Sequence, residues 1–548
     1  MDFSLSDHQL LIRDTVRDFM RNEVRPHVKD WERTDHFPLE AIKKLGALGC
    51  CGMLTPEAYG GAGLDMISYV LMLEEVARVH ATMSTALAVT NSAVQLPLLA
   101  FATEAQKSRY LKPLAAGEFL GAFCLTEPAA GSDAAAIQAT ATPCSGRSLD
   151  RPSESASARG TVTPDCAPGV SSAPSPTRHP EPAAGEGSLF SSTSHESRIT
   201  SHYLLSGTKT WVTNGSQAGL YIIFAKTDPA AAGKGITAFL VEPTFPGFTI
   251  GRHEDKMGQR SSPSVEIILN DCEVPAANRL GEEGQGLKIA LSALDGGRIG
   301  IAAQAVGLAQ GALDESVKFA RSRKAFGQSI SEFQAIQFML ADMHTEIEAA
   351  RALLYHAAFQ KDRSSPVAPA CPEPRRASSR HSTQSALSLG GLPFAPFAKG
   401  GSSLPSSSPG APGTAVAPGL LGSSSTGRWS PVAGPSSSAS SPDGTGGRSF
   451  SSDIDQTGKV RASAPEELLS SSTSHESRLT GHASSSAKLY ASEMVNRVVY
   501  KAVQIHGSLG YSRESEVERM YRDARVISIY EGTSEILRTI IARDLLRS

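Results

Sequence analysis

One acidic residue, Glu531, stands in a setting that could give it unusual chemistry. It follows the apolar residues Ile527, Ile529 and Tyr530, and Gly532 comes directly after it. A carboxylate among apolar neighbours loses solvation, which raises its pKa and makes it a stronger base, and a glycine lets the backbone approach a ligand closely. The alternative is a surface glutamate in a turn before a helix, and these residues by themselves favour that alternative.

Two other polar groups could contact a ligand. Thr533, Ser534 and Glu535 open a predicted helix, and the free N–H groups at such a helix start suit a phosphate. Asp295 and Arg298 are three residues apart in another predicted helix, where an exposed ion pair is the simpler interpretation. The sequence contains no GxGxxG after a predicted strand, no Walker loop and no metal-ligating cluster. NAD, ATP and catalytic zinc therefore have no support, and we predict no metal.

Composition narrows the class of protein. The 548 residues carry 52 Lys and Arg against 55 Asp and Glu, for a formal net charge of −3. This balance argues against a nucleic-acid-binding protein. Seven cysteines without a CxxC pair fit a reduced compartment. The N-terminus lacks the apolar run of a secretory signal and is too acidic for a mitochondrial transit peptide. No run of 18 apolar residues predicts a membrane span, and Thr82–Phe101 is interpreted as a buried helix.

The elements that must position these residues change in type along the chain. Helical periodicity is seen at the start, where Ser6 and Gln9 form a capping box and Pro26 is expected to end the first run. Short β-branched and aromatic runs between turn residues then predict an antiparallel sheet or barrel, and long amphipathic helices follow. The further expected helices are Pro38–Leu48, Met66–Val79, Glu104–Leu111 (stopped by Pro113), Gly286–Ala320, Ser331–Lys361, Ala487–His506 and Ser534–Leu546.

Two stretches interrupt this pattern, at about 143–200 and about 363–485. Both are rich in Ser, Pro, Gly and Ala and lack apolar periodicity, so we expect them to be disordered. Similar peptides, Ser191–His202 and Ser471–His482, lie near their ends. They are either a repeated binding peptide or, more simply, duplicated low-complexity sequence. We therefore expect an α+β protein with an N-terminal helical domain (1–117), a middle antiparallel β domain (118–282) and a C-terminal four-helix bundle (283–548).

Four motifs resemble those of the acyl-CoA dehydrogenase family. CLTEPAAGSDAAA (Cys124–Ala136) and QIHGSLGYSRESEVERMYRD (Gln504–Asp523) are similar to its two signatures. RKAFGQ (Arg323–Gln328) and IYEGTSEILR (Ile529–Arg538) are similar to two further motifs. Their order agrees with the family once both stretches are removed. The resemblance covers the remaining residues, implies the same helical–β–helical fold, and is greatest for the short-chain (butyryl-CoA) branch.

The resemblance implies a reaction and a cofactor. The reaction would be FAD-dependent α,β-dehydrogenation of a short-chain acyl-CoA to trans-2-enoyl-CoA in fatty-acid or branched-chain amino-acid β-oxidation. Glu531 would take the α-proton, and flavin N5 would accept the β-hydride. Some branches of the family place the base where this chain has Gly297, which cannot act as one. The backbone N–H of Glu531 and a flavin hydroxyl would stabilise charge on the thioester oxygen.

The family pattern also assigns binding residues. Those implied for FAD are Phe123, Leu125, Thr126, Gly131, Ser132, Trp211, Thr213, Arg323, Phe326, Gln334, Gln504, Ile505, His506, Gly507, Ser508, Thr533, Ser534 and Glu535. Those implied for the substrate are Ser132, Asp295, Arg298, Tyr530 and Gly532. Arg323 would hold the pyrophosphate across a subunit interface, and Gln504–Ser508 would hold the adenosine of the partner's FAD. Trp211 could instead be a core aromatic, and Phe326 and Gln334 could simply pack in the bundle.

The resemblance finally implies partners. These are the acyl-CoA substrate, an electron-transfer flavoprotein and further copies of the chain in a homotetramer (a dimer of dimers). The family suggests the mitochondrial matrix, with the cytoplasm as the alternative. Two other functions stay open, an acyl-CoA oxidase of the same fold and a catalytically silent scaffold whose inserted stretches recruit partners.

Overall fold

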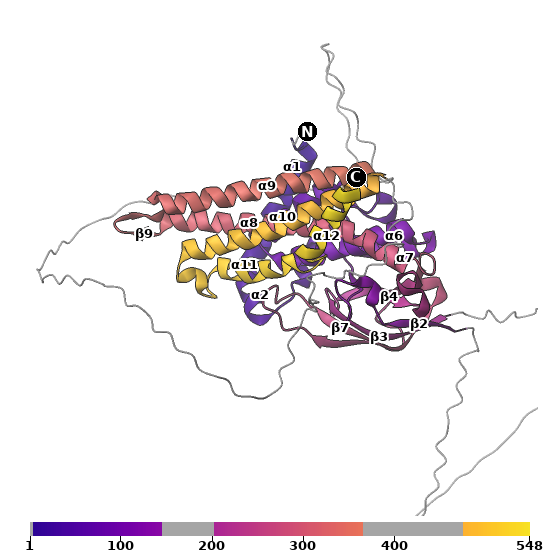
Figure 1. Ribbon diagram of the computed structural model, residues 1–548. Coiled ribbons are helices and arrows are strands. Elements are labelled where there is room, and N and C mark those ends of the chain that lie inside the picture. Colours follow the sequence, from indigo (N-terminus) through magenta and orange to yellow (C-terminus); the bar gives the residue numbers. More distant parts are fainter. Residues whose placement is uncertain (1–3, 145–201, 365–474, 548) are drawn as a thin grey trace, which may run out of the picture. The chain divides into compact units, whose positions relative to one another are not determined.

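A computed structural model describes residues 4–144, 202–364 and 475–547 of the chain (Figure 1). The N-terminal part is helical, as predicted. Its first helix begins after the predicted capping box, because Ser6 Oγ accepts from the Gln9 backbone N–H while Gln9 Oε1 accepts from Ser6 N. The helices of this part are α1 (Asp7–Phe19), α2 (Val28–Thr34), α3 (Leu39–Ala47), α4 (Met66–Ala77), α5 (Ala81–Ala88), α6 (Leu96–Phe101) and α7 (Glu104–Ala116).

Two prolines do not end helices as the sequence predicted. Pro26 lies in a 3₁₀ turn that leads directly into α2, where its missing N–H costs little because the first turn leaves such groups unbonded. Pro113 lies inside α7, which continues to Ala116. The helix ends at Gly117 in the left-handed conformation, and the Pro113 carbonyl still accepts from Glu118 N at 3.0 Å.

The apolar run Ala81–Phe101 is a continuous helical segment formed by α5, a π-helical turn at Val89–Gln95, and α6. Among the described residues it is the one helix long and apolar enough to cross a membrane, judged by length and composition. About 72% of its most apolar window is buried inside the fold, which agrees with the predicted core helix.

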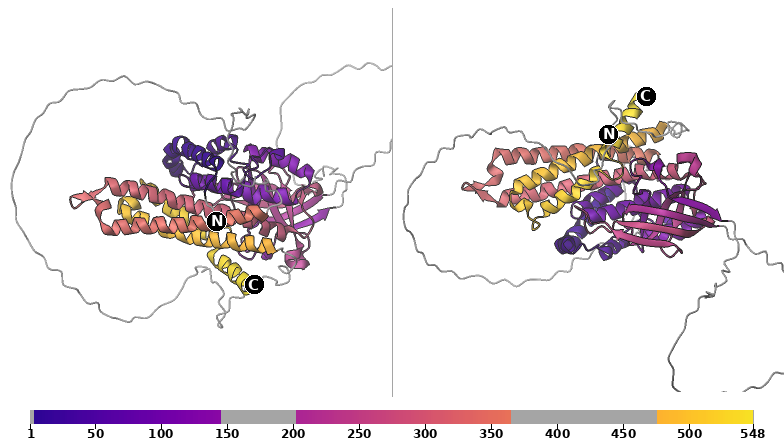
Figure 2. Two further views of the ribbon diagram at one scale, coloured as in Figure 1. Left: turned by 90° about the horizontal axis from the view of Figure 1, so that it is seen from above. Right: turned by 60° about the horizontal axis from the view of Figure 1, so that its bottom comes forward.

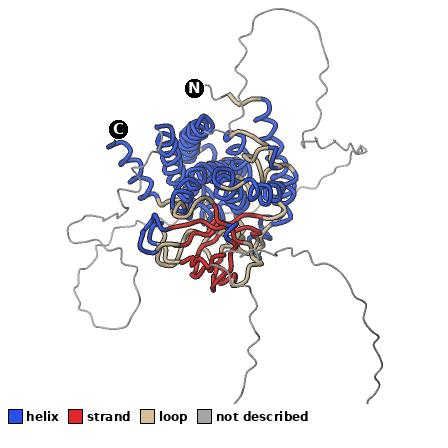
Figure 3. The backbone as a smooth tube through the Cα atoms, turned by 90° about the vertical axis from the view of Figure 1, so that its right-hand side faces the viewer, coloured by secondary structure: helices blue, strands red, loops and turns tan. Residues whose placement is uncertain are grey.

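The middle of the chain forms the predicted sheet, drawn red in Figure 3. Its strands are β1 (Leu120–Cys124), β2 (Thr140–Cys144), β3 (His202–Val212), β4 (Ala218–Lys226), β5 (Ile236–Val241), β6 (Phe248–His253), β7 (Val265–Pro275) and β8 (Arg279–Leu280). The order is β6-β7-β3-β2-β4-β5-β8, with β1 beside β4. Pairing is antiparallel except that β4 runs parallel to both β1 and β2, a feature that the sequence did not predict.

The first low-complexity stretch lies outside the described residues, but its two ends are placed. Cys144 at the end of β2 pairs with His202 at the start of β3 in an antiparallel ladder. The stretch therefore connects neighbouring strands at the position of a hairpin loop, as the sequence predicted.

The C-terminal part contains α8 (Gly286–Ser322), α9 (Gln334–Ser364), α10 (His475–His506), α11 (Glu516–Ala524) and α12 (Ser534–Arg547). Helices α8, α9 and α10 lie side by side (Figures 1 and 2). A two-stranded hairpin of β9 (Lys324–Ala325) and β10 (Gln328–Ser329) joins α8 to α9. The helix α11 was not predicted. The predicted α+β architecture is confirmed.

The end of the second stretch was predicted too late. We expected disorder to about residue 485, whereas α10 begins at His475. Ser484 and Ser485 are fully buried, and Ser485 Oγ lies 3.5 Å from Arg298 Nη1. Small residues here let α10 approach α8 closely, so packing replaces the apolar periodicity that the sequence lacks. The rest of the stretch and most of the repeated peptides lie outside the described residues.

Close contact between α4 and α8 completes the core that supports the site. A Cβ atom at Gly307 would lie 2.2 Å from the Glu74 carbonyl oxygen, and one at Gly311 would lie 2.3 Å from that of Arg78. Only glycine permits this approach of the two backbones. The same face of α8 continues toward its N-terminal half through Gly300, Gly297 and Gly296.

Candidate active site

Glu531 lies in a strained turn between a 3₁₀ turn (Arg525–Ser528) and α12. Its φ angle is +55°, and that of Gly532 is +93°. Left-handed backbone is routine for glycine but rare for glutamate, and such strain concentrates at functional sites. The turn gives the Glu531 side chain a fixed direction into the protein.

That direction is toward Gly297 of α8. A Cβ atom at Gly297 would lie 2.5 Å from Glu531 Oε2 and 2.8 Å from the carboxyl carbon. Oε2 is buried and has no hydrogen-bond partner among the described residues. Burial raises the pKa of Glu531 to about 7, opposed by the positive charges of Arg298 and Lys488. The sequence argument for a basic carboxylate thus has a structural counterpart, and Gly297 is glycine because the carboxylate occupies its side-chain space.

Lys488 of α10, which the sequence analysis did not single out, supports the turn. Its side chain is fully buried, and Nζ donates a hydrogen bond to the Gly532 carbonyl oxygen at 2.7 Å. Burial lowers the pKa of Lys488 to about 8, while the negative charge of Glu531 opposes that shift. A signal was present, because the helix predicted at Ala487–His506 carries this lysine beside apolar residues. Lys488 both fixes the carbonyl after Glu531 and supplies a nearby cation.

Arg298 is the second cation that acts on Glu531, besides Lys488. It is buried and pairs with Asp295 at 2.8 Å, but its Nε has no hydrogen-bond partner. The pKa of Asp295 is raised by burial, which the charge of Arg298 partly offsets. The pair is therefore more than an exposed helix contact. Its predicted role in binding the CoA arm stays a prediction.

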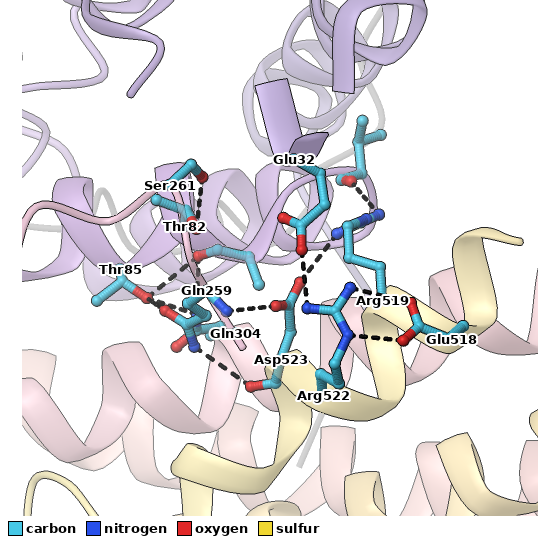
Figure 4. Close-up of polar contacts among 12 residues, drawn as sticks. Glu32, Thr82, Thr85, Gln259, Ser261, Gln304, Glu518, Arg519, Arg522 and Asp523 are labelled. Carbon is cyan, nitrogen blue, oxygen red and sulfur yellow. Dashed lines mark hydrogen bonds and ion pairs between the residues drawn. The ribbon is translucent and has the colours of Figure 1, made fainter. Parts of the chain in front are cut away.

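A buried polar network fixes the residue before the base. The Tyr530 hydroxyl donates to Gln304 Oε1 and accepts from Gln259 Nε2 at 3.4 Å. Gln304 and Gln259 both bond to Thr85, each at 2.7 Å (Figure 4). The predicted contact of Tyr530 with substrate could therefore involve only its partly exposed ring, because its hydroxyl is already occupied.

The network continues to the ion pairs of Arg519 and Arg522, which are drawn toward the right of Figure 4. The Gln259 backbone N–H donates to Asp523, which pairs with Arg519 at 3.0 Å. The neighbouring Arg522 pairs with Glu32 of α2 at 2.8 Å and with Glu518 at 2.7 Å. These contacts join the N-terminal helices, the loop before β7 and α11. They therefore connect the helical N-terminal part, the sheet part and the C-terminal part around the turn at Glu531. No local pattern of residues indicated these contacts.

Thr533, Ser534 and Glu535 form one wall of a pocket at the start of α12. Thr533 Oγ1 accepts from Ile536 N at 3.3 Å, and Ser534 Oγ donates to Glu493 Oε1 at 2.6 Å. The remaining lining residues are Asn496, Arg525, Ser528 and Ile529. A helix start beside an arginine suits a phosphate group, so these residues fit the pyrophosphate end of FAD.

A second group of predicted residues surrounds the end of β1. The Thr126 carbonyl oxygen accepts from Thr210 N at 2.9 Å, which places the first signature beside β3, the strand that contains Trp211 and leads to Thr213. Trp211 is 57% exposed and has a φ of +58°. A strained, exposed indole is not the core aromatic of the alternative interpretation, and it fits a residue that covers a flavin ring.

The rest of this group leaves room for a ligand. Gly131 and Ser132 are exposed, and nothing lies within 4 Å of a Cβ atom at Gly131. Phe123 is half-buried and Leu125 is buried. Beneath them Glu127 accepts from Lys209 Nζ at 2.6 Å and from the backbone of Ala139 at 3.0 Å. This fully buried pair fixes the loop on which the predicted flavin contacts lie.

The third group of predicted residues lies at the end of the helical bundle. The rings of Phe319 and His506 stack at 4.3 Å, which brings the end of α8 next to the end of α10. Phe326 is 97% exposed with a φ of +51°, and Arg323 is exposed. Gln334, Gln504, Gly507 and Ser508 are exposed too, whereas Ile505 and His506 are buried. The hairpin at β9 and the sheet that contains β3 lie toward opposite ends of the bundle in Figure 1.

Comparison with known proteins decides the family. Models of the acyl-CoA dehydrogenase N-terminal, middle and C-terminal domains match residues 6–118, 181–272, and 284–378 with 468–546. The chain belongs to the acyl-CoA dehydrogenase family. A short-chain specific acyl-CoA dehydrogenase, mitochondrial, from Mus musculus is 32% identical over 541 residues, covering 99% of this chain and 90% of the relative.

Solved structures agree with this assignment. The butyryl-CoA dehydrogenase of Megasphaera elsdenii is 31% identical with a TM-score of 0.68, and all of both chains is covered. A chain from a structure described as the electron transferring flavoprotein of Acidaminococcus fermentans is 32% identical with a TM-score of 0.68, again over all of both chains. This enzyme is thus an FAD-dependent oxidoreductase of the acyl-CoA dehydrogenase family.

Proposed function

We propose that this enzyme dehydrogenates short-chain acyl-CoA thioesters to trans-2-enoyl-CoA, with Glu531 as the base. The observation that carries the proposal is the buried, unpartnered Glu531 Oε2, held in a strained turn against Gly297. Its pKa of about 7 makes the carboxylate a far better proton acceptor than an exposed glutamate. The similarity to butyryl-CoA and short-chain specific dehydrogenases supports the substrate class.

The residues of the chain account for the proton part of the reaction. Glu531 removes the α-proton of the thioester, and the electron pair of that C–H bond forms the new double bond to the β-carbon. When bound, FAD accepts the hydride that leaves the β-carbon. The N–H of Glu531 is positioned by the same strained turn, which makes it the candidate donor to the thioester oxygen. The positive charges of Arg298 and Lys488 oppose the rise in the pKa of Glu531 and so increase the fraction of ionised carboxylate.

Asp295 and Arg298 are the proposed contacts of the CoA arm, and Ser132 is a further one. FAD would lie between Trp211 and the Thr533–Glu535 pocket of one chain. The end of the bundle that carries Arg323 and Phe326 would contact it from another chain. Since the Arg323 and Phe326 hairpin is exposed in the single chain, we infer that it contacts FAD bound to a second copy. Reoxidation by an electron-transfer flavoprotein is supported by the description of one solved relative, and a mitochondrial location by the name of the mammalian one. The homotetramer rests on the family resemblance of the sequence.

Anaerobic titration of the FAD-loaded protein tests this proposal. Butyryl-, hexanoyl-, octanoyl- and isobutyryl-CoA are added in turn while the flavin absorbance is followed. The proposal predicts bleaching, with butyryl- or hexanoyl-CoA most effective. Absence of bleaching with every thioester would overturn it, and fast peroxide production in air would show that the enzyme is an oxidase.

A further inference from the structure

Two buried polar atoms from other elements, both without hydrogen-bond partners among residues 4–144, 202–364 and 475–547, lie against one face of α8. The first is Glu531 Oε2, 2.5 Å from the position of a Cβ atom at Gly297. The second is the Tyr69 hydroxyl of α4, 2.7 Å from the corresponding position at Gly300. The two glycines are three positions apart in the helix, which corresponds to a rise of roughly 4.5 Å along its axis. The tyrosine hydroxyl therefore lies about one helical turn beyond the base.

The Tyr69 hydroxyl is in an unusual state for a buried group. The side chain is fully buried; burial raises its pKa, the nearby Ser92 side chain lowers it, and the negative charge of Glu531 raises it further. Ser92 Oγ donates to the Ala88 carbonyl oxygen at 2.6 Å, so it could only accept from Tyr69, and no hydrogen bond of that geometry is formed among the described residues. An unpaired buried hydroxyl costs about 1–3 kcal/mol, and such groups are rare in packed cores. Two of them on one helix face indicate a space that a ligand or water fills.

Tyr69 cannot easily move out of this space. A Cβ atom at Gly300 would also touch Leu73 Cδ1 and Ala88 Cβ, each at 3.4 Å. The two helices that hold the ring are in backbone contact, since a Cβ at Gly307 would lie 2.2 Å from the Glu74 carbonyl oxygen. A close-packed wall of this kind resists insertion of extra methylene groups.

We propose that Tyr69 is the floor of the acyl pocket and sets the upper limit of chain length, with Gly300 providing the space for its hydroxyl. The inference rests on the proposed function, because it takes Glu531 as the group beside the α-carbon. Each C–C bond advances a chain by roughly 1.3 Å, so about three or four bonds fit between the base and the hydroxyl. Acyl groups of four to six carbons are then accommodated, and an eight-carbon chain meets the ring.

Binding to a variant that cannot turn over tests this directly. In FAD-loaded Glu531→Gln protein, the Kd of butyryl-, hexanoyl- and octanoyl-CoA is measured by calorimetry with and without Tyr69→Ala. Removing the ring should improve the Kd of octanoyl-CoA relative to that of butyryl-CoA at least about tenfold. Met72→Ala is the matched control, because Met72 is a fully buried side chain of the same helix and does not supply any of the three atoms nearest to a Cβ at Gly300; its ratio should equal that of the parent.

A second variant should make the acyl pocket shallower. It keeps the inference testable if Tyr69→Ala does not fold. Gly300→Ala places a methyl group against the Tyr69 hydroxyl, so it should weaken hexanoyl-CoA binding relative to butyryl-CoA about fivefold or more. Unchanged ratios in both variants, with normal FAD content and circular dichroism, would overturn the inference. Flavin reduction of the wild-type protein by butyryl-CoA is scored separately, so failure of the floor is distinguished from failure of the proposed reaction.

Discussion

The proposed base and the surfaces that are predicted to face the flavin are built in opposite ways. Glu531 is surrounded by buried groups of its own chain, including the fully buried Lys488. Its carboxylate occupies the space in which a side chain at Gly297 would lie. Trp211 and Phe326, which are predicted to face FAD, are 57% and 97% exposed. All three residues have strained backbone, but only Glu531 directs its carboxylate oxygen Oε2 into a buried position.

The difference follows from what each surface must do. A proton-transfer group needs a controlled pKa, which requires burial and fixed charges at fixed distances. A flavin brings its own apolar ring, so the chain needs only exposed aromatic and charged faces for it to cover. Changes on the base side should therefore affect chemistry without loss of FAD, and changes on the exposed side should do the reverse.

The largest effect of a supporting residue is expected for Lys488→Met. The change removes the hydrogen bond to the Gly532 carbonyl and a cation that lowers the pKa of Glu531. We expect kcat to fall roughly 30–100-fold with FAD retained, and the pH profile to move upward. Lys501→Met is the control, since Lys501 of the same helix pairs only with Asp342 and Glu346 on the surface. A normal pH profile in Lys488→Met would show that this lysine has no part in the base.

Arg323→Ala tests the exposed side. The loss of a charge-assisted hydrogen bond to a phosphate should weaken FAD binding by about tenfold or more, with the fold unchanged. FAD retained after gel filtration is the measurement. Arg321→Ala, an exposed arginine in the last turn of the same helix, should retain FAD like the wild type. Equal retention by the two variants would remove Arg323 from the cofactor site.

Gly297→Ala sharpens the geometry of the base. The added methyl group would lie 2.5 Å from Glu531 Oε2, so the carboxylate must shift. We expect kcat to fall about tenfold, because small displacements of a reacting group are costly, while thermal stability stays the same or rises. At Gly481 of α10 a Cβ would meet only Asp295, at 3.8 Å, so Gly481→Ala should leave kcat unaltered.

The pH dependence is the mildest test. Glu531 must be ionised to accept a proton, and its pKa is raised to about 7. We predict that kcat/KM rises about tenfold per pH unit below pH 7 and then levels. Above pH 8 it should decline as Lys488, with a pKa of about 8, loses its proton. A single rise centred near pH 4.5 would mean that the carboxylate behaves as an exposed one.

Local sequence predicted the elements well and singled out Glu531, whose role as the base stays a prediction. The capping box at Ser6 and the β-branched runs carry their signals within a few residues, and so does Glu531 among apolar neighbours. Pro26 and Pro113 were misjudged because a proline is tolerated where its N–H is not needed or its loss is offset by other bonds. The early start of α10 was missed because its serines face a neighbouring helix instead of forming an apolar stripe.

The supporting residues of the site could not be predicted in the same way. Lys488, Tyr69 and Gln259 contact the base region through pairings between segments far apart in the sequence. Their roles depend on which helix faces which, and that is decided by tertiary packing. Only Lys488 left a signal, as a lysine on an apolar helix face.

Rapid mixing of FAD-loaded Glu531→Gln with butyryl-CoA under anaerobic conditions tests the central claim most directly. The amide keeps the shape of the side chain but cannot accept the α-proton. We predict that the variant binds butyryl-CoA with near wild-type Kd while flavin reduction falls by about 10³-fold or more. Flavin reduction at a rate close to that of the wild type would contradict the account and place the base elsewhere.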